Sequence, residues 1–463
     1  MNSRRRRWVG LTVTVAVLAV GPGVASAHTV ASSRFESPLP LSWLFAGAGV
    51  TVALTALWLA VTERTPAASR DGRHVLTVPA RVTTALRYGL AGVFLAGVIT
   101  ALVVGILGRQ VAAENVATLF VWPVWFRGLA LLALLVGTVW PTLSPWQTLY
   151  RGLLRLEGDR IALVGSYPDR LGAWPAVVGF VVLLGIVENL TVIPRSPRLT
   201  TVVVASYALA MLAGAVCFGP TWFRKADPLG VLYRLFGRVA SLSVTRREDG
   251  SYSLHARAPW TGCLDAVAGS SLVVFVVATV YTVSFDGFTN TRLYQRVLFG
   301  TRDVLGTGPG TSMLLYAVGL AGFLAAFVAG VWAVERLGAS AGRDWTDALA
   351  AFAPTVLPIA AAYEVAHNYP YVLRNLADLV ARSLSGSASL DILGWLSLPA
   401  FWASQVLLIV VGHVVAVVAA HYVAVERYET VSDARRGHLP LVVVMVGYTV
   451  LSLWIISQPV VAG

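Results

Sequence analysis

The sequence predicts an all-α fold, a polytopic membrane helix bundle of about ten transmembrane helices that follows a cleavable signal peptide and carries one small cytoplasmic β-hairpin. Two observations predict it. The 463-residue chain is 57% hydrophobic and only 13% charged, whereas soluble domains carry about 25% charged residues. Apolar runs of about 20 residues, the length that crosses a bilayer, recur along the whole chain. The mean hydropathy of +0.72 agrees with both.

Residues 1–27 have the three parts of a secretory signal peptide. Residues 4–7 are four arginines, residues 8–20 are apolar, and Ala25-Ser26-Ala27 is a small-residue cleavage site. Cleavage there would leave His28 as the mature N-terminus, outside the cytoplasm. The alternative is an uncleaved first helix, but Gly21-Pro22-Gly23 interrupts the apolar run.

Residues 28–463 are predicted to form a single polytopic membrane domain. The expected spans are residues 41–61, 87–107, 119–139, 171–190, 200–219, 265–283, 312–334, 349–371, 396–425 and 439–458. Loops after odd-numbered spans hold roughly twice as many Arg and Lys residues as the other loops, and such a bias marks the cytoplasmic side. We therefore expect a cell-membrane protein with both its mature N-terminus and its C-terminus outside.

The longest inner loop, residues 220–262, contains the run SLSVTRREDGSYSLHARAPW. Its alternating pattern around Asp249-Gly250 predicts a β-hairpin. The sequence has no Walker A phosphate-binding motif, no Gly-rich dinucleotide fingerprint after a predicted strand and no H-E-x-x-H motif. The formal charge of +12 fits cytoplasmic loops of a membrane protein, so no nucleic acid is expected as a partner. The expected partners are the lipid bilayer and a small-molecule or metal-ion ligand, and the sequence identifies no protein partner.

The run 351–375 is long and apolar enough to cross a bilayer, yet it contains Glu364 and His367. Three residues apart, they share one helix face. The next span carries His413 and His421 on one face, with His421 close to its cytoplasmic end. Ionisable groups inside a membrane usually mark a site, although each histidine could also be a hydrogen-bonded contact between helices. Glu364, His367 and His413 are therefore expected to form an outward-facing site between the eighth and ninth spans.

Other polar groups lie towards the predicted outer side. Arg127, Glu188 and Asp286 could each be an ordinary interfacial charge, and Asp286 could equally be a catalytic carboxylate. A mature-start His28 could chelate copper through its α-amino group and imidazole. His74, His255 and His438 fall in predicted inner loops, where solvation is sufficient to explain them.

Four stretches together resemble the multi-pass membrane proteins of the fenitrothion hydrolase family: SFDGF at 284–288, LPIAAAYEVAHNY at 357–369, GHVVAVVAAHYVAV at 412–425 and LVVVMVGYTVLSLWIISQ at 441–458. The likeness runs over most of the chain. It implies hydrolysis of an organophosphate triester, and by position it carries over His28, Asp286, His367, His413 and His421. Two positions depart from the family pattern, which has an apolar residue at Glu364 and an aspartate at Tyr422.

Three functions follow as hypotheses. The first is a hydrolase with a divalent transition metal such as zinc or copper, held by His367 and His413 with His28 and His421 as further candidates. Glu364 or Asp286 would then be a ligand or general base. The second is a secondary transporter or a metal- or proton-handling protein that uses the same residues. The third is an assembly factor whose polar residues only pack.

Overall fold

A computed structural model describes residues 40–62, 72–158, 161–338, 345–385 and 391–458. In these ranges ten helical segments are long and apolar enough to cross a membrane, which confirms the predicted number. The signal peptide and His28 lie outside the described residues. Seven spans are single helices, and the first six of these are α2 (Leu41–Thr62), α3 (Ala80–Leu107), α9 (Pro197–Phe218), α12 (Ser270–Thr289), α14 (Thr311–Leu337) and α17 (Leu398–Arg427).

The seventh single-helix span is α18 (Val431–Ser457), and the other three spans are composite helices. The third span joins α4 (Val116–Leu119), the π-helix η1 (Phe120–Gly128) and α5 (Leu129–Val136). The fourth joins α8 (Trp174–Phe180) and the π-helix η3 (Val181–Glu188). The eighth joins α15 (Trp345–Phe352), the 3₁₀ turn η6 (Ala353–Val356) and α16 (Leu357–Ser385).

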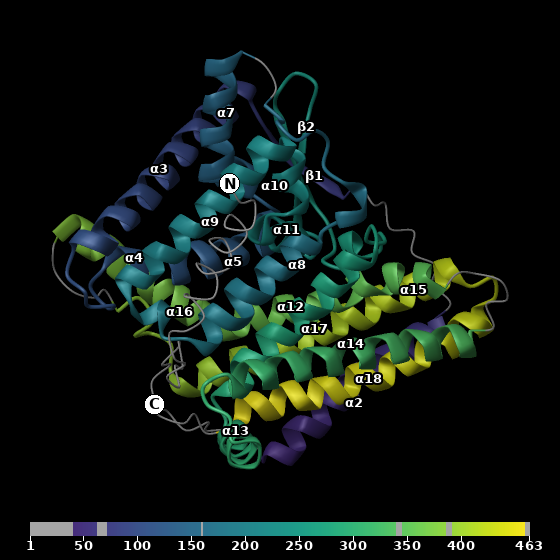
Figure 1. The fold of residues 1–463 in the computed structure, drawn as a ribbon. Helices are drawn as coiled ribbons and strands as arrows, with labels where there is room; N and C mark the ends of the chain where they lie inside the picture. The colour runs from purple at the N-terminus through teal and green to yellow at the C-terminus, as the bar shows by residue number, and fades with distance from the viewer. Residues whose placement is uncertain (1–39, 63–71, 159–160, 339–344, 386–390, 459–463) are drawn as a thin grey trace, which may run out of the picture.

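Short elements complete the chain. The helices are α6 (Trp140–Leu143), α7 (Pro145–Glu157), α10 (Thr221–Lys225), α11 (Pro228–Phe236) and α13 (Arg292–Leu305). The 3₁₀ turns are η2 (Asp169–Leu171), η4 (Ile193–Arg195) and η5 (Thr261–Cys263). In Figure 1 the strands, α7 and α10 gather at the top of the view, while α13 lies at the bottom, at the far end of the long helices.

The predicted hairpin is confirmed as β2 (Leu242–Arg246) and β3 (Tyr252–Ala256), paired antiparallel. Its turn contains Gly250, whose φ of 79° favours glycine. A third strand, β1 (Arg73–Val78), pairs with the other edge of β3 and was not predicted. Because β1 follows the first span and the hairpin follows the fifth, this pairing places both loops on the same side of the bundle.

Helix α11 is folded into the bundle although it belongs to the predicted inner loop. Asp227, fully buried, caps the helix by accepting a hydrogen bond from the backbone N–H of Gly230 at 3.0 Å. The Trp140 indole donates to the same carboxylate at 2.8 Å, and the Tyr207 hydroxyl also donates to it. One buried carboxylate thus fixes α11 against α6 and α9.

The eighth and ninth spans are neighbours, as their order in the sequence suggests. A Cβ built on Gly412 of α17 would lie 2.3 Å from the Cβ of Ala362 on α16. Small residues let membrane helices approach this closely. Pro354 lies in η6, so the 3₁₀ segment between α15 and α16 contains a residue whose ring removes a backbone donor.

Candidate functional site

The centre of the bundle holds a buried arginine that faces three carboxylates. Arg127 Nε lies 2.8 Å from Glu188 Oε1, and its Nη1 lies 2.9 Å from Glu364 Oε2. Asp286 is more distant, with Oδ2 3.7 Å from Arg127 Nη2. The side chains of all four residues are no more than 5% exposed. We call these four residues and His367 the central cluster.

Four spans supply the central cluster: Arg127 comes from η1, Glu188 from the last turn of η3, Asp286 from α12, and Glu364 and His367 from α16. Arg127 and Glu188 could have been ordinary interfacial charges by sequence, and the structure excludes this interpretation, since it buries both. A signal was present: Arg127 stands near the middle of an otherwise apolar span, where an ionisable side chain is costly unless paired.

Two of these residues lie on π-helical segments, which often occur at functional sites. Pro123 within η1 has no N–H to donate, so the local hydrogen-bond ladder is altered one turn before Arg127. The hydroxyl of Tyr233, on α11, lies 3.0 Å from the carbonyl oxygen of Trp125 and 3.1 Å from that of Phe126. The short helix α11 therefore supports the irregular segment that presents Arg127.

The central cluster carries more acid than base. Three ionised carboxylates and one guanidinium have a net charge of −2, which protonation of His367 would reduce to −1. Removing uncompensated charge from water costs several kcal/mol per ion, about 20 kcal/mol in the idealised limit. This balance favours retention of at least one proton among these groups.

His367 is the most accessible member of the central cluster, with 17% of its side chain exposed. Its Nε2 lies 3.5 Å from Oδ2 of Asp286, and its ring stacks on that of Tyr363 at a centroid distance of 6.0 Å. The carboxylate of Asp286 thus lies between the guanidinium of Arg127 and the imidazole of His367. Sequence reasoning named Asp286, Glu364 and His367, and the structure brings these three together.

His413 has different surroundings. Its Nδ1 donates to the carbonyl of Ile409, one turn earlier on α17, at 2.8 Å. Its ring packs 5.7 Å from that of Tyr448 on α18, and Nε2 has no hydrogen-bond partner within the described ranges. The expected grouping of His413 with Glu364 and His367 is not among the contacts formed in the described part of the chain.

His421 lies further along α17, where its ring is 5.4 Å from that of His438 on α18. The expectation that His438 is solvated in a loop was wrong, since it is 3% exposed within a membrane-spanning helix. His74 and His255 form a separate pair across β1 and β3, with ring centroids 5.5 Å apart. The six histidines in the described ranges therefore do not converge on one centre.

The residues present do not form a ready metal site. In the five described ranges, no group of three or more His, Cys, Asp or Glu side chains is placed to hold a metal ion. Glu188 and Glu364 instead accept hydrogen bonds from Arg127. His28, the other candidate ligand, lies outside the described residues.

Comparisons of the chain with protein-family models, with curated proteins and with solved structures found no match. The chain is an integral membrane protein by its ten apolar helices.

Proposed function

We propose that this membrane protein is a proton-coupled secondary transporter, in which the central cluster takes up and releases a proton as a solute crosses the bilayer. The observation that carries the proposal is the buried excess of carboxylates around Arg127. Buried carboxylates and histidines inside membrane spans are the usual components of proton relays.

Asp286 and His367 are the proposed proton-carrying pair. Glu188 and Glu364 lie at hydrogen-bond distance from Arg127, whereas Oδ2 of Asp286 lies 3.7 Å from Nη2, so Asp286 is the carboxylate of the three that is farthest from Arg127. His367 is 3.5 Å from Asp286 and is partly exposed, which makes it the natural point of exchange with water. Protonation of Asp286 would weaken its attraction to Arg127 and leave the two glutamates to balance the guanidinium.

The broken helices support coupling between the proton and a conformational change. Transporters often place their sites on interrupted spans, because irregular backbone is tolerated where it lines a protein interior. Arg127 and Glu188 both lie on π-helical segments, and η6 interrupts the eighth span before Glu364. A change in the charge of the central cluster therefore acts on segments that are not locked into regular α-helix.

Proton flux through the reconstituted protein tests this proposal. Liposomes with an entrapped pH dye receive a potassium diffusion potential and a panel of small-molecule solutes, and the solute-dependent rate of internal pH change is measured. The wild-type rate should exceed that of empty liposomes, and Asp286→Asn should remove most of the excess. Asp303→Asn, at an exposed position of α13, is the matched control and should retain it. Equal flux in wild type and Asp286→Asn would reject the assignment.

A second candidate, hydrolysis of an organophosphate triester, is favoured by the proximity of His367 to Asp286. A carboxylate beside an imidazole is an arrangement that suits a general base for a water molecule. The resemblance to the fenitrothion hydrolase family implies the same chemistry. Purified protein would be assayed with fenitrothion, with and without a chelator. Hydrolysis that disappears in His367→Gln supports the enzyme, and absence of turnover in the wild type excludes it for this substrate.

A further inference from the structure

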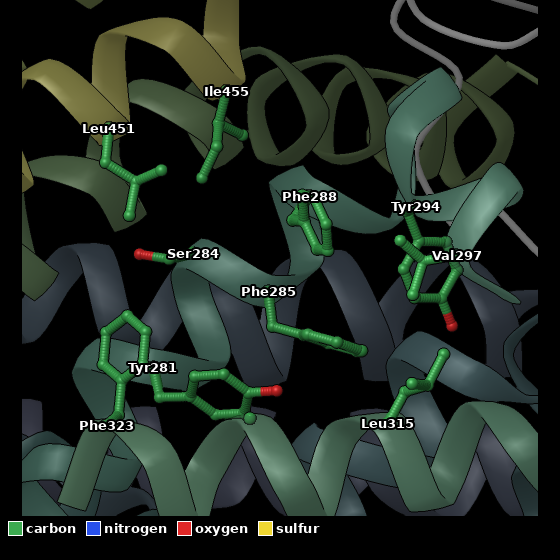
Figure 2. Close-up of a pocket in the computed structure, with 11 residues that line it drawn as sticks. Tyr281, Ser284, Phe285, Phe288, Tyr294, Val297, Leu315, Phe323, Leu451 and Ile455 are labelled. Carbon is green, nitrogen blue, oxygen red and sulfur yellow. The ribbon is translucent and has the colours of Figure 1, made fainter. Parts of the chain in front are cut away.

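An apolar furrow, made of two neighbouring cavities, lies between α14 and α18. One cavity of about 270 Å³ is lined by residues of α12, α13, α14 and α18 (Figure 2). A second, of about 240 Å³, is lined by α12, η6, α16, α14 and α18. Phe323 and Leu451 line both cavities, so the two cavities adjoin between α14 and α18, and together we call them the furrow.

The side chains that line the furrow suit an apolar ligand. Its two central hydroxyl groups satisfy each other, because Ser284 Oγ and the Tyr448 hydroxyl are hydrogen-bonded. Ser284 Oγ also donates towards the Val280 carbonyl at 3.1 Å. The remaining lining side chains are aliphatic or aromatic, including Phe323 and Leu451. A polar solute would find few free groups here, whereas a hydrocarbon chain would lose no hydrogen bonds.

One end of the furrow has a different character. Helix α13 contributes Tyr294 and Val297 to the first cavity. Tyr294 is 3% exposed, and its hydroxyl has no hydrogen-bond partner in the part of the chain that the structure describes. A buried hydroxyl left unpaired usually indicates an unseen partner such as water or a ligand oxygen.

The exposed face of α13 is that of a helix at a membrane surface. It presents Arg292 and Arg296 together with apolar side chains such as Phe299 and Val304, which is 84% exposed. Basic residues beside apolar ones suit a helix that lies between lipid headgroups and acyl chains. Anionic headgroups attract such arginines by about 1 kcal/mol per side chain.

From these observations we infer that the furrow is a binding site for one anionic phospholipid of the bilayer. Its acyl chain lies between α14 and α18, its ester oxygen accepts a hydrogen bond from Tyr294, and its phosphate lies beside Arg292 and Arg296. This inference is independent of the proton-coupled transport proposed above, because it uses none of the central cluster.

The test uses liposomes that contain phosphatidylglycerol with a photoactivatable acyl chain, diluted in phosphatidylcholine. After illumination, cross-linked peptides are identified by mass spectrometry. We expect labelling concentrated on the peptides of α14 and α18 that contain Phe323 and Leu451. Labelling spread evenly over all lipid-facing helices would show an annular lipid only and would overturn the inference.

Two glycines give a matched pair of variants. Gly447 lines the second cavity, and a Cβ built there has no atom within 4 Å, so Gly447→Leu should place its side chain in the furrow. Gly322, on α14 but outside the cavity lining, has equal free space. Labelling should fall several-fold in Gly447→Leu and persist in Gly322→Leu. Equal labelling of the two variants contradicts the site.

The headgroup is tested by competition. Arg296→Gln should lower the preference for phosphatidylglycerol over phosphatidylcholine by about fivefold, which corresponds to about 1 kcal/mol for one arginine. Arg198→Gln, at an exposed position at the start of α9, is the control and should leave the preference unchanged. If Arg296→Gln keeps the wild-type preference for phosphatidylglycerol over phosphatidylcholine, the site does not select an anionic headgroup.

Discussion

At the residue scale, Arg127 is the side chain on which the central cluster depends. It is 2% exposed and donates to Glu188 and Glu364. A lysine could not reproduce these contacts, because only the planar guanidinium spreads several donors in one plane. Removing the cation would leave three buried carboxylates near one another, an arrangement that a folded protein tolerates poorly.

Arg127→Gln should therefore lower the free energy of unfolding by about 3–5 kcal/mol, the usual cost of breaking a buried ion pair. Thermal unfolding in detergent micelles measures the effect. Glu364→Gln added to this variant should restore part of the loss, because one uncompensated carboxylate is then removed. Arg198→Gln, at an exposed position, should unfold like the wild type. If Arg127→Gln also unfolds at the wild-type temperature, the ion pairs of Arg127 do not stabilise the fold.

The residue types of the candidate site were partly predictable. Glu364, His367 and Asp286 were recognisable because each interrupts an apolar run. An ionisable side chain in hydrocarbon is energetically costly and therefore usually marks a site. The position of His413 was not predictable in the same way. Helical spacing gives the face on which it lies, but whether that face meets α16 or Tyr448 of α18 depends on how the helices pack.

At the element scale, α11 shows how a loop becomes part of the membrane bundle. The helix begins at a buried Asp227 and carries Tyr233 to the carbonyl groups of η1. The sequence assigned residues 220–262 to a cytoplasmic loop, because hydropathy windows detect long spans and not nine-residue insertions. The π-helices were also unpredicted, since their geometry reflects tertiary contacts such as that of Tyr233.

Asp227→Ala should destabilise the protein by about 3 kcal/mol. The substitution removes the acceptor for the Trp140 indole, the Tyr207 hydroxyl and the Gly230 N–H. Each buried donor left unpaired costs about 1–3 kcal/mol, and such costs are not additive. Chemical unfolding in micelles, followed by tryptophan fluorescence, would measure the loss. A midpoint unchanged from the wild type would contradict the role given to Asp227.

A pH dependence follows from the same residue. Burial raises the pKa of the Asp227 carboxyl, while the hydrogen bonds from Trp140 and Tyr207 oppose the rise. The folded state then holds this proton to a higher pH than the unfolded chain. The contribution of this bound proton to the free energy of unfolding is fully present below the pKa of Asp227 in the unfolded chain. That contribution is lost as pH rises through the pKa of Asp227 in the folded state. The stability of the wild type relative to Asp227→Asn should decrease over this interval, and an increase would contradict the assignment.

At the scale of the whole molecule, the sheet fixes how the loops are arranged. Pairing of β1 with β3 requires the loops after the first and fifth spans to share one membrane side. The alternation of ten spans then puts α13, which follows the sixth, on the other side. The number and order of spans were predictable from hydropathy, whereas β1 was not, because a six-residue strand inside a loop has no local signal that requires a distant partner.

Single cysteines test this arrangement. In a background with Cys217→Ser and Cys263→Ala, a cysteine is placed at Val75 of β1, Val244 of β2 or Val304 of α13, which are 51%, 44% and 84% exposed. A membrane-impermeant maleimide added to sealed vesicles should label the first two sites from one side and the third only from the other. Labelling of all three from the same side would contradict the topology.

The proposed transport requires Asp286, in the buried cluster around Arg127, to take up and release a proton. Infrared difference spectroscopy between about pH 5 and about pH 8 measures the protonation of carboxyl groups directly. The account predicts a protonated-carboxyl band in the wild type that disappears in Asp286→Asn and remains in Asp303→Asn. A spectrum in which Asp286→Asn keeps the whole band would contradict the claim.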